Sequence, residues 1–131
     1  MSVKKFKYLS FHKVTGKGGG YDGNDVLVLD EPGQGGACHE YAIAKADCDE
    51  SEPPLALVKF QNGPIQEVGV NGAQQEDLLA IVIDRLSAFQ AGPFANAYNQ
   101  EALDACKSAL AALHRRTTDR IARNVEGFNK A

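Results

Sequence analysis

The residues of this chain that are best suited to chemistry are five charged side chains near its C-terminal end, spaced as two rows on one helix. Arg115, Asp119 and Arg123 follow one another at intervals of four, so they can neutralise each other. Arg116 and Arg120 form the neighbouring row, where like charges one turn apart repel. Such a pair suits an anion, because arginine offers forked donors to phosphate or carboxylate. The pattern also fits a solvated basic helix end, whose sign the helix dipole favours. Both interpretations stay open from this segment alone.

The distribution of charge narrows the choice of partner. The chain has 131 residues and a net charge of −3. Residues 100–131 carry +2 and the remainder −5. General affinity for DNA, RNA or an anionic membrane usually needs a broad basic excess, so a small anion or short nucleotide fits better. We expect one domain over residues 1–131, too small to enclose a sizeable ligand without a partner subunit.

Motifs for catalysis are mostly absent from the sequence, and no His-x3-His or Cys-x2-Cys pair anchors a metal site. The sequence has three cysteines, Cys38, Cys48 and Cys106. Their odd number and the lack of CxxC spacing argue against both a disulfide framework and a zinc ribbon, so we expect a reducing compartment. The glycine-rich segment 16–20 lacks the Walker pattern and predicts a flexible turn. These residues identify no catalyst, and we expect no metal and no cofactor. The N-terminus has no apolar stretch like that of a signal peptide, so we expect a soluble cytoplasmic protein.

The elements that must position the arginines begin with a strand-like half, residues 1–72. Short runs of strand-forming residues occur at 6–12, 26–29, 37–44 and 55–60, with a further short strand expected at 65–70. Asn62 and Gly63 form a dipeptide that favours a tight hairpin turn. These runs predict an antiparallel β-meander.

The second half, residues 73–131, changes to a helical period. Apolar residues from Leu78 to Phe89 recur at helical spacing, with Asn71 as the expected cap and Gly92 with Pro93 as the stop. A longer stripe predicts a second helix from residue 97 to about 123, ended at Asn124. We expect an α+β fold in which the meander packs on an antiparallel helical hairpin.

This arrangement separates the candidate residues. Phe89 and Asn99 lie at the closed end of the hairpin, whereas Arg116 and Arg120 lie roughly 25–30 Å further along the second helix at 1.5 Å per residue. One small ligand can touch both groups only if an antiparallel neighbour supplies the arginines. Taken singly, Phe89 also fits a core residue and Asn99 a cap.

Three separated blocks, at residues 60–72, 78–90 and 116–127, resemble the phage Thoeris anti-defence protein 1 family. The resemblance covers residues 36–127. The hairpin is also similar to that of phage proteins that sponge the cyclic oligonucleotides of CBASS defence. Such proteins bind an immune messenger without cleaving it. The resemblance therefore implies a non-catalytic sponge for a TIR-generated cyclic ADP-ribose isomer of the glycocyclic type, acting in the host cytoplasm.

The resemblance also implies roles for individual residues. Phe89 corresponds to the platform for adenine, Asn99 to a polar contact, and Arg116 with Arg120 to the clamp on the phosphates. It implies a homo-oligomer, a dimer or a hexamer of dimers, with the ligand at the subunit interface. A second site for cyclic trinucleotides is implied near Arg123, although the chain has Asn124 and Phe128 where the family usually has glycine and threonine.

Two alternatives of other classes remain at this point. A nucleotide-cleaving enzyme would use Glu126 or Asp119 beside the arginines, and a structural or nucleic-acid-binding phage protein would bind polymers in a salt-sensitive way. For the sponge, replacing Arg120 by glutamate is expected to abolish capture without unfolding, on the assumption that this helix position is exposed.

Overall fold

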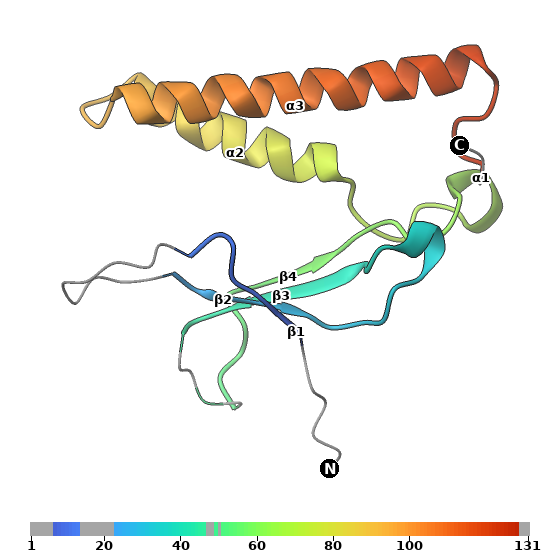
Figure 1. Ribbon diagram of the computed structural model, residues 1–131, viewed down its shortest axis with the longest axis horizontal. Coiled ribbons are helices and arrows are strands. Elements are labelled where there is room, and N and C mark those ends of the chain that lie inside the picture. The colour runs from blue at the N-terminus through green and yellow to red at the C-terminus, as the bar shows by residue number, and fades with distance from the viewer. Residues whose placement is uncertain (1–6, 14–22, 47–48, 50, 129–131) are drawn as a thin grey trace. The chain divides into compact units, whose positions relative to one another are not determined.

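The computed structural model of the protein describes residues 7–13, 23–46, 49 and 51–128. The chain divides into two compact units, Met1–Asn62 and Gly63–Ala131. The described part of the first holds a β-sheet and that of the second holds helices (Figure 1). The predicted α+β class is therefore confirmed. One domain over residues 1–131, with the sheet packed on the hairpin, stays a prediction.

The first unit is an antiparallel meander. Its strands are β1 (Lys7–Leu9), β2 (Asp25–Val28), β3 (Glu40–Ala44) and β4 (Ala56–Lys59), and they pair in chain order. A short 3-10 helix, η1 (Gln34–Gly36), lies between β2 and β3. The meander and its first four strands are confirmed, with narrower bounds than the sequence suggested. The glycine-rich segment 16–20 and Cys48 lie outside the described residues.

Both faces of this sheet carry apolar side chains. Neighbouring residues on a strand point to opposite faces, so the row Leu27, Ala42 and Leu57 lies on one face and the pair Val28 and Tyr41 on the other. Val28 and Ala42 are buried, whereas Leu57 is exposed. An apolar surface on each side needs cover from another element or another chain.

A carboxylate fixes the connection from β2 to β3. The carboxylate of Asp30 accepts the N–H of His39 at 2.9 and 3.1 Å and the N–H of Glu40 at 3.1 Å. Burial raises the pKa of Asp30, but these hydrogen bonds and the nearby His39 together lower it by more. The net pKa of Asp30 therefore lies below the usual 3.8. The ionised form of Asp30 therefore stabilises the start of β3.

The strand expected at residues 65–70 is wrong, because Ile65–Val68 forms the short helix α1. Pro64 precedes its first turn, where proline is well tolerated, and Gly69 ends it with a φ of 76°. The N–H of Gln66 donates to the carbonyl oxygen of Gly127 at 3.0 Å. Asn62 and Gly63 therefore lead into a helix and not into a hairpin.

The rest of the second unit is the predicted helical hairpin. Helix α2 (Gln75–Gln90) and helix α3 (Ala97–Ala122) run antiparallel and pack against each other (Figure 1). Of the apolar side chains described on these two helices, only Leu103 is buried. Helix α3 has 26 residues and α2 has 16, so the last turns of α3 extend beyond their partner.

The ends of these helices follow the capping rules, with one correction. The cap of α2 is Gln74, whose N–H donates to the Asp77 carboxylate at 2.9 Å, and not the expected Asn71. Helix α3 is capped by Asn96, which accepts the N–H of Asn99 at 2.8 Å. After α3, Asn124 has a φ of 56°, which confirms its expected role as the residue that stops the helix.

Candidate functional site

The closed end of the hairpin gathers aromatic rings around Phe89. Phe89 is half-buried in the last turn of α2, and its ring meets that of Phe94 edge to face, with centroids 6.4 Å apart. The guanidinium carbon of Arg85 lies 5.0 Å from the centroid of the Phe89 ring. Phe94 and Tyr98 are 70% and 83% exposed. A flat apolar group therefore finds several stacking surfaces here.

Asn99 borders the same loop. Its side-chain amide donates to the carbonyl oxygen of Phe94 at 3.5 Å, and it is half-buried. Gln90 holds the loop from α2, since its side chain donates to the carbonyl oxygen of Asn96 at 3.1 Å and accepts the N–H of Asn96 at 3.0 Å. The structure therefore brings Phe89 and Asn99 together, with Phe94 between them.

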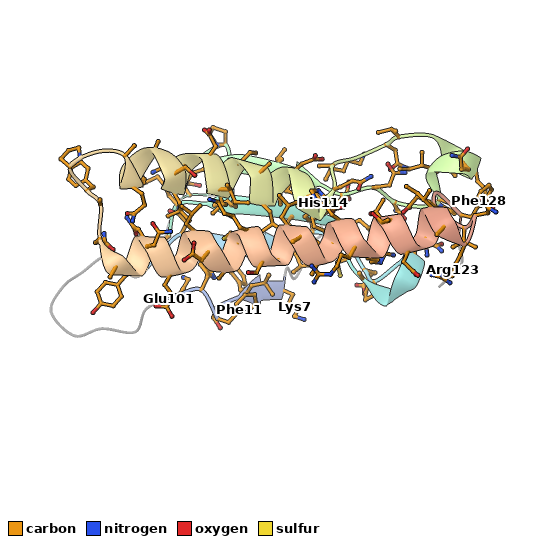
Figure 2. All side chains as sticks on the ribbon, turned by 90° about the horizontal axis from the view of Figure 1, so that it is seen from above. Lys7, Phe11, Glu101, His114, Arg123 and Phe128 are labelled. Carbon is orange, nitrogen blue, oxygen red and sulfur yellow. The ribbon has the colours of Figure 1, made fainter. Side chains whose placement is uncertain are left out.

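The other candidate residues lie at the far end of α3. Figure 2 shows Arg123 and Phe128 at one end of α3 and Glu101 near the other. Arg116 is exposed, and none of the ion pairs among the described residues involves it. Arg123 donates from Nε to the carboxylate of Asp119 at 3.0 Å, as the spacing of the first row predicts. Arg116 thus presents a guanidinium that water or an anion can reach.

Arg120 is not exposed, which corrects the expectation from sequence. It is 5% exposed, and its Nη2 donates to the carbonyl oxygens of Val125 and Phe128, both at 2.8 Å. Its Nε lies 3.6 Å from a carboxylate oxygen of Glu126. The chain after α3 turns back over this side chain, so Arg120 donates hydrogen bonds to carbonyl groups just beyond the helix end and holds this turn in place. Replacing it by glutamate is therefore expected to disturb the fold as well as any binding.

The turn that covers Arg120, residues 123–128, also contacts α1. Gly127 has a φ of 82°, and a Cβ atom at this position would lie 2.7 Å from Cγ of Gln66. Glycine is therefore required both by the backbone conformation and by the close approach of α1. The position of this turn decides whether Arg120 is covered.

The two groups of candidate residues do not meet within one hairpin. Asn99 and Arg116 lie on the same straight helix, separated by about 25 Å at 1.5 Å per residue. The closed end supplies stacking surfaces and amides, and the far end supplies cations. The ion pair of Arg123 with Asp119 does not test the second site expected near Arg123, which stays a prediction.

The carboxylates that a cleaving enzyme would use are both beside arginines. Asp119 pairs with Arg123, and Glu126 pairs with Arg120 and accepts the N–H of Gly127 at 3.0 Å. Within the described ranges, no group of three or more His, Cys, Asp or Glu side chains is placed to hold a metal ion. No helix among these residues has the length and apolar character needed to cross a membrane.

Two residues of the closed end, Arg85 and Phe94, were not predicted from the sequence. Arg85 lies four residues before Phe89, a spacing that places the two side chains on one face of a helix. That signal was available in the sequence. Phe94 lies in the loop, and no periodic pattern indicates that its ring meets Phe89.

Comparison with known proteins links this chain to a described domain. Residues 54–118 match the family model of the Acb2/Tad1 hairpin domain. A relative named "Thoeris anti-defense 1", from Bacillus phage SBSphiJ7, is 47% identical over 76 residues. The match covers 58% of this chain and 54% of the relative, so the chain spans about half the length of that protein. The segment that matches the family model includes Phe89, Asn99 and Arg116.

Proposed function

The chain belongs to the Acb2/Tad1 hairpin-domain family, and on this premise we propose that it is a phage anti-defence protein that binds and sequesters an immune nucleotide. The proposed ligand is a TIR-generated cyclic ADP-ribose isomer of the glycocyclic type. Sequestering it without cleavage keeps the Thoeris effector inactive. The observation that carries the proposal is the family match, which spans the aromatic closed end and Arg116.

The chemistry of the two ends suits the parts of this ligand. A cyclic ADP-ribose contains an adenine, two riboses and a pyrophosphate. Phe89 offers a stacking surface to the adenine, a contact worth about 1–3 kcal/mol per base. Asn99 offers an amide to the ribose or base, and Arg116 offers planar paired donors to the pyrophosphate.

Because the two ends lie far apart on one hairpin, the proposed site is shared between two chains. In an antiparallel pair of hairpins, the closed end of one chain lies beside the arginines of the other. Apolar side chains left exposed on the helices support such an assembly, among them Ile81 at 63% and Ile121 at 59%. We therefore propose a homo-oligomer, a dimer or a hexamer built from dimers.

Arg120 takes part in this clamp only after a rearrangement. Its Nη2 is engaged with the carbonyl oxygens of Val125 and Phe128. Phosphate oxygens are acceptors of the same kind with a full charge, so they can replace these carbonyl groups when residues 123–128 move. Arg116 needs no such movement, and it is the first contact in the proposed site.

The proposal is tested by capture and release. The protein is incubated with the product of a TIR enzyme, free ligand is removed, and the protein is denatured by heat. Mass spectrometry and an effector assay then identify what is released. Release of intact messenger supports the sponge; an altered product indicates the cleaving enzyme, and release of no nucleotide contradicts both.

Matched variants locate the site in the same experiment. Phe89→Ala and Arg116→Gln are expected to lose capture. Lys107→Gln removes one exposed charge from α3 away from both ends, and it is expected to capture as the wild type does. Equal capture by all three variants would show that the messenger binds elsewhere.

A further inference from the structure

We propose that Arg85 is a further ligand-binding residue, whose guanidinium plane stacks on the nucleobase opposite Phe89. The inference rests on the proposed function, and it assigns a base-binding role to a cation of the closed end. The phosphate contacts of the far end are separate from it.

The guanidinium group of Arg85 lies against the ring of Phe89. Arg85 and Phe89 are one turn apart on α2, and the guanidinium carbon lies 5.0 Å over the ring of Phe89. The ring of Phe94 makes an edge-to-face contact with the ring of Phe89, with 83° between their planes, whereas the guanidinium carbon of Arg85 lies over the Phe89 ring. The face on which a base would stack is thus already covered by a cation with a flat, weakly hydrated head.

Arg85 is also able to move aside. Its side chain is exposed, and none of the ion pairs among the described residues holds it. An exposed contact between a cation and a ring is weaker than the stacking of a base on an aromatic side chain. A base therefore displaces the guanidinium from Phe89, and the guanidinium then stacks on the outer face of the base.

In this arrangement both faces of the base are covered, which a single aromatic ring cannot achieve. Phe89 covers one face of a base and leaves the other in water. A guanidinium on the second face encloses the base between two planes, as arginine does with unstacked bases in RNA recognition. The site should then discriminate for a flat aromatic base and against ligands that carry only the phosphates.

The test measures affinity for the nucleotide that heat releases from the wild-type chain in the capture experiment. Arg85→Met keeps the length of the side chain but loses the charge and the plane, and it should weaken binding about five- to tenfold. Arg85→Lys keeps the charge alone and should be within about twofold of Arg85→Met. Lys107→Met is the control for removal of an exposed charge, and it should bind as the wild type does.

A spectroscopic readout separates stacking from a structural role. The proton on Nε of Arg85, identified by its loss in Arg85→Lys, should shift upfield when the nucleotide binds, because it enters the ring current of the base. Wild-type affinity in Arg85→Met, wild-type affinity in Arg85→Lys, or an unmoved Nε proton would each overturn the inference and leave the proposed function intact. If the wild-type chain releases no nucleotide at all, the proposed function and this inference both fall.

Discussion

Replacing Arg120 by methionine removes the guanidinium that holds the turn after α3. The wild-type side chain is buried and donates to the carbonyl oxygens of Val125 and Phe128, each at 2.8 Å. Methionine has a similar length and fills much of the same space, but it cannot donate to either oxygen. The two carbonyl groups then lose their charged donor.

The magnitude follows from these contacts. A hydrogen bond to a charged group contributes about 1.5–3 kcal/mol, so two contribute about 3–6 kcal/mol at most. The ion pair with Glu126 is partly exposed and adds less than about 1 kcal/mol. Phe128 is exposed, so water can reach its freed carbonyl and offset part of the loss. We expect Arg120→Met to destabilise the end of α3 by about 2–4 kcal/mol.

The assay has a global and a local readout. Urea unfolding followed by helical circular dichroism gives the free energy of unfolding, and hydrogen exchange follows the amides of Val125 and Phe128. Arg116→Met is the matched control on the exposed row, expected within about 0.5 kcal/mol of the wild type. If Arg120→Met matches this control in both readouts, Arg120 does not hold the turn.

Three further outcomes follow from other contacts. The lowered pKa of Asp30 contributes stability that is present above pH 3.8 and is lost as the pH falls through the folded-state pKa. Asp30→Asn should therefore lower Tm at neutral pH and reduce the change of Tm below pH 4. A pH profile of Tm identical to that of the wild type would contradict this. Gly127→Ala should destabilise the chain by more than Gly35→Ala in urea unfolding, because both have a positive φ but only Gly127 lies against Gln66. Equal losses would exclude a role for that close approach. Asn96→Ala removes the cap of α3 and should cost about 1 kcal/mol in the same assay; a loss below about 0.3 kcal/mol would show that the cap is dispensable.

The helices were predictable because their signals are local. The apolar period from Leu78 to Phe89, the stop at Gly92 and the break at Asn124 each depend on neighbours in sequence. The four short strands were found for the same reason, from runs of strand-forming residues. Most of the predicted strands were longer than the observed ones, because the pairing partner decides where a strand ends.

Two features depended on contacts that the sequence does not display. Residues 65–68 contain Ile and Val, which favour strands, yet Pro64 and the contact with Gly127 hold them as helix α1. Arg120 has the spacing of an exposed row, but the turn after α3 folds back and buries it. Local spacing cannot foresee burial by a segment that returns from beyond the helix end.

The candidate site was predictable in part. Spacing along the helices placed Phe89 with Asn99 and separated them from Arg116, and the structure agrees with both. Arg85 could have been found from its spacing to Phe89, whereas Phe94 depends on the path of a loop. The assignment of a nucleotide to these residues rests on the family and not on their geometry.

The most direct test of the shared site is to combine two defective chains. Phe89→Ala and Arg116→Gln should each capture no messenger when expressed alone. In a mixed dimer, the wild-type Phe89 of one chain faces the wild-type Arg116 of the other, so co-expression should restore one intact site per mixed dimer. Recovered capture in the co-expressed sample, with intact messenger on release, is the expected result. Capture no greater than that of either variant alone would contradict a site shared between two chains.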